Sequence, residues 1–223
     1  MTVDIAFFER EAKVKGFPFI AGIDEAGRGP LAGPVVSAAV ILPDDVIFQN
    51  ESEKHQNKDA VSGITDSKAL TEKKRERLYD VIYENAVSIG IGIVDAVFID
   101  RINILKASLL SMKIACDHLY PNPDFLLIDG KFEIDSTIPQ KAVIKGDSKS
   151  ISVAAASIIA KVTRDRLMLK YHEEYPEYGF NRHKGYPTRK HREIVHHLGP
   201  TPIHRVTFNG VLPDPLFRSN NQS

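Results

Sequence analysis

Five short apolar runs stand out in the pattern of hydrophobic and polar positions along the chain. Each is bounded by glycine, proline or a charged residue, and each has the length of a buried strand. The runs predict strands at residues 17–23, 35–42, 88–94, 124–128 and 141–145. A loop rich in Gly and Pro separates the first two runs, so we expect these two strands to form a hairpin.

Apolar residues at helical spacing occupy the segments between and after the later strands. They predict helices at residues 71–86, 101–119, 150–171 and 188–197. The first and the last of these begin at threonines, Thr71 and Thr188, which suit the N-cap position. Residues 44–63 are polar and mixed, and we interpret them as a long exposed loop.

The predicted order is hairpin, helix, strand, helix, two strands and two helices, which is typical of a layered α/β domain. We expect a core over residues 1–170 and a helical segment of the same domain over residues 171–212. The remaining residues, 213–223, contain prolines and end in SNNQS, so we expect a flexible tail.

Acidic residues follow three of the predicted strands. Asp24 and Glu25 come after FIAGI, Asp129 after FLLI, and Asp147 after AVIKG. A single acid at a strand end is usually a turn or helix cap. Four of them in one pattern indicate a site, because sites of open α/β sheets lie beyond the strand ends. Converging carboxylates repel one another, and a cation removes that repulsion.

No set of Cys and His with the spacing of a zinc site accompanies these acids, so the ligands would be oxygens. Oxygen ligands favour Mg²⁺ or Mn²⁺, and two such ions about 4 Å apart are used to hydrolyse phosphodiesters. Neighbouring residues of a strand point to opposite faces. Asp24 and Glu25 can share a site only if the turn after Ala26 begins early enough to bring Glu25 round.

Gly27, Arg28 and Gly29 open the loop of the predicted hairpin. A dinucleotide-binding fingerprint is excluded, because a β-branched strand follows the glycines where that fingerprint needs a helix. The glycines permit a close approach of backbone to a ligand, and Arg28 is suited to grip a phosphate. An ordinary glycine turn is the alternative, and the tripeptide alone does not decide between them.

The charge of the chain is unevenly spread, although its net value is zero. Residues 141–205 hold 13 Lys and Arg against 6 Asp and Glu, a local net charge of +7, and six of the eight histidines. Such a region attracts a polyanion or is simply a solvated helical surface. Cys116 is the single cysteine, so no internal disulfide forms and we expect a cytoplasmic protein. No apolar run approaches the roughly 20 residues of a membrane span.

Taken together, six motifs in this order resemble ribonuclease HII, the type 2 ribonuclease H of bacteria. They are AGIDEAGRGPLAGP, TDSKAL, FLLIDG, KGDSKS, SVAAASIIAKVTRDR and YGFNRHKGYPT, and the match covers residues 20–208. The relative ribonuclease HIII carries an additional N-terminal domain, and the short segment before DEAGRG fits the HII branch better.

The resemblance implies an α/β ribonuclease H-like fold, with a mixed central sheet flanked by helices and a small helical C-terminal extension. It implies Mn²⁺- or Mg²⁺-dependent cleavage of the RNA strand of RNA–DNA hybrids and at single ribonucleotides embedded in duplex DNA. Two divalent ions are expected in the active complex. By motif, Asp24, Glu25 and Asp129 are similar to the metal ligands of the family, and Asp147 matches its fourth active-site acid.

The resemblance also implies substrate-binding residues. Gly27, Arg28 and Gly29 would approach the 2′-hydroxyl of the ribose, and Tyr186 matches the ribonucleotide-sensing tyrosine of the family. From the residues themselves, further contacts to the nucleic acid are predicted at Lys68, Ser148 and Lys184, with a solvated surface lysine as the alternative for Lys68.

Two questions remain open at this stage: the role of Asp165 and the function class of the chain. Asp165 is either a fifth acid or the ion-pair partner of a neighbouring arginine, and we favour the ion pair. The whole chain is either the nuclease, a duplex-binding module without activity, or a phosphotransferase with an aspartate nucleophile. We expect in-line hydrolysis that leaves a 3′-hydroxyl and a 5′-phosphate, and a monomer without membrane association.

Overall fold

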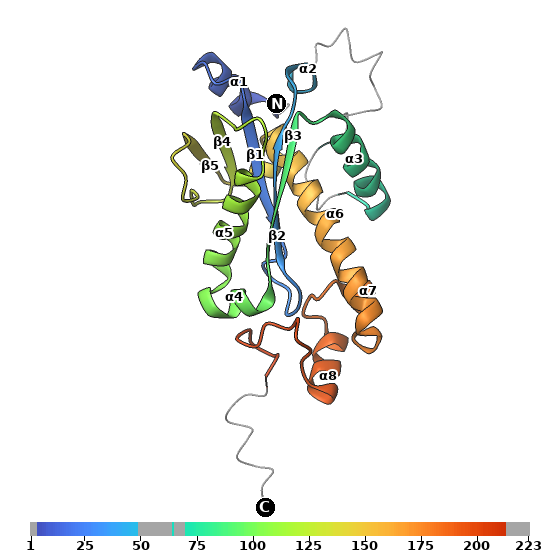
Figure 1. Ribbon diagram of the computed structural model, residues 1–223. Coiled ribbons are helices and arrows are strands. Elements are labelled where there is room, and N and C mark those ends of the chain that lie inside the picture. The colour runs from blue at the N-terminus through green and yellow to red at the C-terminus, as the bar shows by residue number, and fades with distance from the viewer. Residues whose placement is uncertain (1–3, 49–63, 65–69, 213–223) are drawn as a thin grey trace, which may run out of the picture.

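A five-stranded mixed sheet forms the centre of the computed structural model, which describes residues 4–48, 64 and 70–212 (Figure 1). The strand order is β3-β2-β1-β4-β5. β1 pairs antiparallel with β2, and β2 with β3, whereas β4 runs parallel to both β1 and β5. The predicted hairpin and the α/β class are therefore confirmed. The strands are β1 (Ile20–Ala26), β2 (Val35–Ile41), β3 (Ser88–Val94), β4 (Phe125–Asp129) and β5 (Gln140–Val143).

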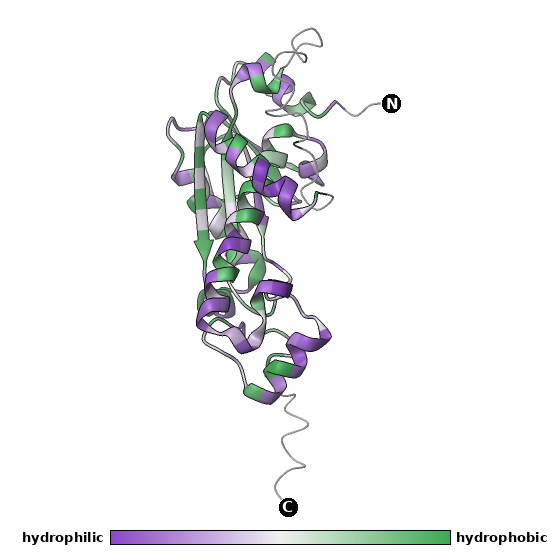
Figure 2. Ribbon diagram, turned by 90° about the vertical axis from the view of Figure 1, so that its right-hand side faces the viewer, coloured by the Kyte–Doolittle hydropathy of each residue, from purple (hydrophilic) through white to green (hydrophobic). Residues whose placement is uncertain are grey.

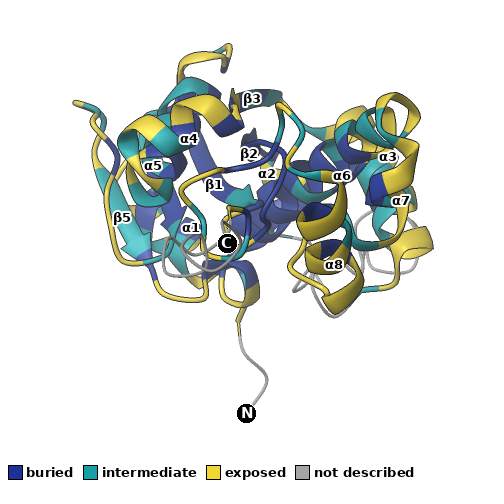
Figure 3. Cartoon of the chain, turned by 90° about the horizontal axis from the view of Figure 1, so that it is seen from below, coloured by how far each residue is buried: buried dark blue, intermediate teal, exposed yellow. Residues whose placement is uncertain are grey.

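Helices cover both faces of the sheet, so that β1 and β2 are buried between them (Figures 1 and 3). α6 (Ile151–Glu174) crosses one face and α5 (Ile104–Asp117) lies on the other, while α3 (Glu72–Asn85) packs outside α6. The helices alternate hydrophilic and hydrophobic residues, as expected for elements with one buried side (Figure 2).

Small residues allow these helices to approach the sheet closely. A Cβ on Gly22 of β1 would overlap the backbone of Ser152 in α6. A Cβ on Gly90 or Gly92 of β3 would overlap a backbone carbonyl of α5. The alternation of Ile and Gly in β3 is thus explained by α5, which rests directly on the strand backbone.

The predicted helix caps are present, but one predicted helix is two. Thr71 accepts a hydrogen bond from the Lys74 amide and Thr188 from the His191 amide. The expected helix over 101–119 is instead α4 (Ala96–Ile102) followed by α5. Asn103 breaks it, because its φ of 69° lies in the left-handed region and its side chain caps the new helix at the Lys106 amide.

The N-terminal helix α1 (Phe7–Val14) was not predicted, since charged residues obscure its short apolar face. The loop predicted over residues 44–63 is wrong at its beginning, where α2 (Asp44–Ile47) forms and buries Val46 and Ile47. Residues 49–63 and the predicted tail, 213–223, lie outside the described residues.

The segment after α6 packs against the β1–β2 loop. It contains the one-turn helix η3 (Pro176–Tyr178), α7 (Phe180–His183) and α8 (Arg189–Leu198). Another one-turn helix, η2 (Gly146–Ser148), lies elsewhere, between β5 and α6. A hydrophobic cluster joins Leu31 and Ala32 of the loop to Met168, Phe180 and Val195. The helical C-terminal extension is confirmed, while the division at residues 170 and 212 stays a prediction.

Candidate active site

The parallel pairing of β1 and β4 brings Asp24 and Asp129 to the same edge of the sheet. Ile23 is the register partner of Ile128, and the two aspartates follow these residues in their strands. Asp24 is only 3% exposed, and the hydroxyl of Ser157 on α6 hydrogen-bonds its carboxyl group. The Glu25 amide donates to Asp24 Oδ1 at 2.7 Å.

The charge of Glu25 acts on Asp24, although Glu25 lies in a regular strand. We expected the turn after Ala26 to begin early enough to bring Glu25 round, but β1 stays regular through Ala26, which pairs with Val36. The extra methylene of glutamate gives its carboxyl group more reach than that of an aspartate. Glu25 Oε1 lies 3.3 Å from Arg28 Nη1, and Glu25 Oε2 is buried without a hydrogen-bond partner among the described residues.

The carboxyl groups of Asp24, Glu25 and Asp129 lie close enough for their charges to act on one another. Burial, and then the negative charges of Glu25 and Asp129, raise the pKa of Asp24 well above its ordinary value. Burial also raises the pKa of Glu25; Arg28 opposes this shift and Asp129 adds to it. The cluster is therefore short of positive charge.

Asp147 lies in the η2 turn, and the first residue of this turn contacts Asp129. The Gly146 amide donates to Asp129 Oδ1 at 2.6 Å, and a Cβ at Gly146 would lie 3.3 Å from that oxygen. Asp147 follows directly and is only 5% exposed. The next residue, Ser148, donates its hydroxyl to the Lys145 carbonyl. The structure thus brings the segments of all four predicted acids to one end of the sheet.

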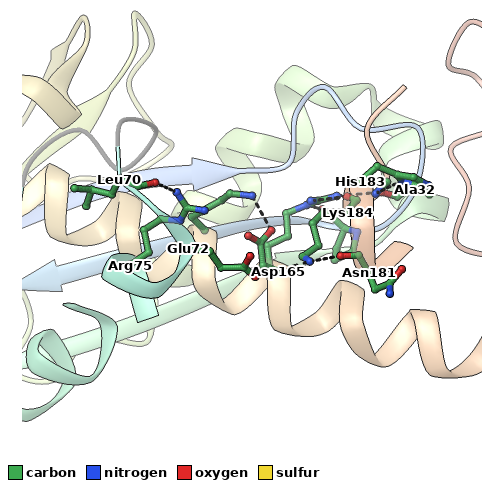
Figure 4. A network of polar contacts seen from close by, with 12 residues as sticks. Ala32, Leu70, Glu72, Arg75, Asp165, Asn181, His183 and Lys184 are labelled. Atoms are coloured by element: carbon green, nitrogen blue, oxygen red, sulfur yellow. Dashed lines mark hydrogen bonds and ion pairs between the residues drawn. The ribbon is translucent and has the colours of Figure 1, made fainter. Parts of the chain in front are cut away.

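The glycine loop and the segment 184–186 lie side by side. The Leu31 amide donates to the Gly185 carbonyl at 2.8 Å. A Cβ placed on Gly29 would have Tyr186 Cε1 as its nearest neighbour, at 3.9 Å. Tyr186 is 42% exposed, so that it is accessible to a ligand. Lys184 donates from Nζ to the Asn181 carbonyl, and Figure 4 shows Lys184 near Ala32 of the loop.

The predictions for Lys68 and Asp165 have other outcomes. Lys68 lies outside the described residues. Asp165 is an ion-pair partner, as favoured, but its partner is Lys161 at 2.7 Å and not an arginine.

Sequence reasoning missed four buried side chains that surround the loop: Arg164, His191, His204 and Arg205. Histidines and arginines are usually exposed, and no local pattern in the chain marks these four as buried. The two arginines donate to backbone carbonyls of the loop, which are distant in sequence, and the two histidines hydrogen-bond to one another.

A divalent cation fits the chemistry of this donor set. The three carboxyl groups repel one another, and the orphaned Glu25 Oε2 needs a partner. Oxygen donors of this kind suit hard cations. No group of three or more Asp, Glu, His or Cys within the described residues already has the spacing of a metal site, so the carboxylates would have to close around an ion.

A mixed five-stranded sheet flanked by helices, with acidic side chains at adjoining strand ends, places the chain in the ribonuclease H-like class of folds. The profile of the family described as Ribonuclease HII matches residues 21–211. Ribonuclease HII of Acetivibrio thermocellus is 52% identical over 206 residues, which are 92% of this chain and 75% of that protein. Ribonuclease HII of Geobacter sp. (strain M21) is 53% identical over 209 residues, which are 94% of this chain and 85% of that protein.

Solved structures show the same fold. Ribonuclease H2 of Pyrococcus horikoshii superposes with a TM-score of 0.67 at 29% identity, over 86% of this chain and 95% of its own. Bst-RNase HIII in complex with Mn²⁺ has a TM-score of 0.61 at 20% identity, over 86% of this chain and 68% of its own, and shows the fold alone.

The chain belongs to the ribonuclease HII family. It is an endonuclease that cleaves the RNA strand of RNA–DNA hybrids and cuts at single ribonucleotides embedded in DNA. The alternatives of an inactive duplex-binding module and of a phosphotransferase are thereby excluded. Within the described residues, no helix has both the length and the apolar character needed to cross a membrane.

Proposed function

We propose that Asp24, Glu25, Asp129 and Asp147 form the catalytic centre and hold two divalent ions, Mn²⁺ or Mg²⁺. The observation that carries this proposal is the mutual repulsion of the first three carboxyl groups around an unpartnered buried oxygen. The Mn²⁺ in the structure of Bst-RNase HIII supports the choice of ion. When bound, such ions activate a water and stabilise the leaving oxygen of a phosphodiester.

The protein groups orient these carboxylates. Ser157 and the Glu25 amide fix Asp24, and the Gly146 amide fixes Asp129. Asp147 is the acid least needed as a direct ligand of the ions. We therefore propose that it orients the attacking water. In-line attack on the phosphorus then leaves a 3′-hydroxyl and a 5′-phosphate.

Substrate recognition is assigned to the residues beside this centre. Gly27, Arg28 and Gly29 approach the ribose, and the exposed ring of Tyr186 borders the same loop. Ser148, Lys184 and, outside the described residues, Lys68 are assigned to backbone contacts. The local charge of +7 over residues 141–205 supports binding of a duplex. We propose that one chain acts as a monomer.

The test is a nicking assay on a duplex that contains one ribonucleotide, beside an all-DNA duplex, with Mn²⁺ present. Asp129→Asn is expected to abolish nicking while leaving duplex affinity nearly unchanged, because phosphate contacts supply most of that affinity. Asp117→Asn is the matched control, since Asp117 forms an exposed ion pair with Lys113 on α5.

Counting the bound ions gives a second readout. Mn²⁺ is titrated into the protein with substrate, and the free ion is measured by electron paramagnetic resonance. We expect two bound ions for the wild type and a lower Mn²⁺ affinity for Asp129→Asn. Normal nicking by Asp129→Asn, or unchanged Mn²⁺ binding, would show that the four acids are assigned wrongly.

A further inference from the structure

Two buried arginines lie directly beneath the glycine loop. Arg205 and Arg164 are 0% and 1% exposed. Within the described residues, every hydrogen bond that their guanidinium groups donate goes to a backbone carbonyl, and neither forms an ion pair. A buried charge with no carboxylate in ion-pair contact is unfavourable; burial lowers the pKa of Arg205 to about 9, and the charge of Asp100 opposes this shift only in part. An arrangement of this cost calls for a role beyond packing.

Arg205 holds both ends of the loop. Its Nη2 donates to the Gly27 carbonyl at 2.6 Å and to the Gly33 carbonyl at 2.8 Å, and its Nη1 donates to the Arg28 carbonyl at 3.0 Å. Its own amide donates to the Leu31 carbonyl. The planar fork of donors matches this set of acceptors, whereas a lysine ammonium is a single point charge.

Arg164 joins the loop to the segment that carries Tyr186. It donates to the carbonyls of Ala32 and Pro34 on one side and of Lys184 on the other, each at 3.0 Å. Figure 4 shows Ala32 and Lys184 close together in this network. The two guanidinium groups therefore fix the relative position of the loop and the tyrosine.

The arrangement also strengthens two amide donors. The Gly27 carbonyl belongs to the same peptide unit as the Arg28 amide, and the Arg28 carbonyl to the same unit as the Gly29 amide. A carbonyl that accepts from a cation polarises its peptide, so the N–H becomes a better donor. Neither amide donates to a group of the described residues. Both are therefore available to an oxygen atom of a ligand.

We propose that Arg205 and Arg164 are positioning residues for ribonucleotide recognition: they set the geometry of the Gly27–Gly29 backbone against Tyr186 and polarise the amides that face the ribose. This inference rests on the proposed function of the loop and goes beyond it, because neither arginine touches the substrate.

The test compares Arg205→Gln, Arg205→Lys and Arg164→Lys with Arg10→Gln, an exposed arginine on α1 that pairs with Asp4. Two quantities are measured: kcat/KM on the duplex with one ribonucleotide, and affinity for the all-DNA duplex. We expect Arg205→Gln to lose at least about tenfold in kcat/KM, the equivalent of one charge-assisted hydrogen bond. Its all-DNA affinity should match that of Arg10→Gln.

The lysine variants separate charge from geometry. Arg205→Lys and Arg164→Lys keep the charge but not the fork, so each should fall between the wild type and Arg205→Gln in kcat/KM. If Arg205→Gln is unfolded at the assay temperature, Arg205→Lys decides the outcome. A further variant, Arg205→Ala, leaves room for a free guanidinium ion. Added guanidinium at millimolar concentration should restore part of the kcat/KM that this variant loses, and should leave kcat/KM of Arg10→Gln unchanged.

A merely structural role predicts a different result. In that case kcat/KM and all-DNA affinity would fall together with the folded fraction, or Arg205→Gln would match Arg10→Gln, and either outcome overturns the inference. The proposed function fails separately: it is overturned if the wild type nicks all-DNA duplex equally, or if Asp129→Asn remains active, whatever the arginine variants do.

Discussion

Gly27 shows how single residues set the geometry of the site. Its φ is +101°, and a Cβ at this position would overlap the side chain of Arg164 and crowd the Pro34 carbonyl. The glycine is therefore needed for two reasons: the backbone conformation, and the passage of a buried guanidinium beneath the loop. A sequence pattern reveals the first reason through the turn, but not the second.

Gly27→Ala tests this interpretation at the residue scale. Gly16→Ala is a matched control, because Gly16 has a φ of +91° and a Cβ there would meet nothing within 4 Å beyond its chain neighbours. Both variants carry similar backbone strain, so their difference isolates the overlap with Arg164. We expect Gly27→Ala to lower the free energy of unfolding by about 1–3 kcal/mol more than Gly16→Ala, measured by urea denaturation. Equal losses would show that the loop moves freely away from Arg164.

The start of α6 is the feature that decides stability at the scale of elements. Ser150 is the N-cap and accepts from the Val153 amide. Its hydroxyl also donates at 2.6 Å to Glu9 Oε1, which is fully buried and accepts from the Ser152 amide as well. Burial raises the pKa of Glu9, and these hydrogen bonds oppose that shift. The cap thus ties α1 to the helix that covers the sheet.

Ser150→Ala is predicted to be more destabilising than the loss of an ordinary cap. Thr71→Ala removes only the bond to the Lys74 amide, and should cost about 1 kcal/mol. Ser150→Ala also takes a donor from a buried carboxyl group, which adds about 1–3 kcal/mol. Chemical denaturation of the two variants gives the difference, and equal values would mean that Glu9 does not depend on Ser150.

At the scale of the whole molecule, a chain of histidines connects the C-terminal segment to the site. His204 Nδ1 accepts from the Thr201 amide, so His204 Nε2 carries the proton that it donates to His191 Nε2 at 3.1 Å. His191 Nδ1 then donates to the Tyr186 carbonyl at 2.9 Å. Burial lowers the pKa of each histidine, His191 and His204, to about 4. His183 stacks on His191, and burial lowers its pKa as well.

This chain predicts a loss of stability in acid. Both folded pKa values lie below the ordinary 6.5, so the unfolded state binds more protons between pH 6.5 and about 4. The free energy of unfolding should therefore fall as the pH is lowered through this window. Carboxyl groups titrate nearby, so the contribution is isolated by comparison with the double variant His191→Gln/His204→Gln, whose slope should be flatter. A slope equal to that of the exposed control His197→Gln would contradict the assignment.

The strands, the hairpin and three of the predicted helices follow from the sequence, because burial against a sheet leaves a short-range pattern of apolar residues. The motif acids likewise lie at strand ends, where the chain itself places them. The sequence did not predict α1 and α2, because their formation depends on packing partners. It predicted a single helix over residues 101–119, because the left-handed conformation of Asn103 leaves no pattern in the sequence.

By itself, the sequence determined the class of fold and the family, and it predicted which acidic residues form the site. The tertiary structure decided how Glu25 joins Asp24 from a regular strand, and why buried arginines and histidines surround the glycine loop. The physical reason is that a carboxyl pKa, or the partner of a guanidinium, depends on groups more than a hundred residues away. Folding alone brings Arg205 under Gly27 and the charge of Asp129 close to Asp24.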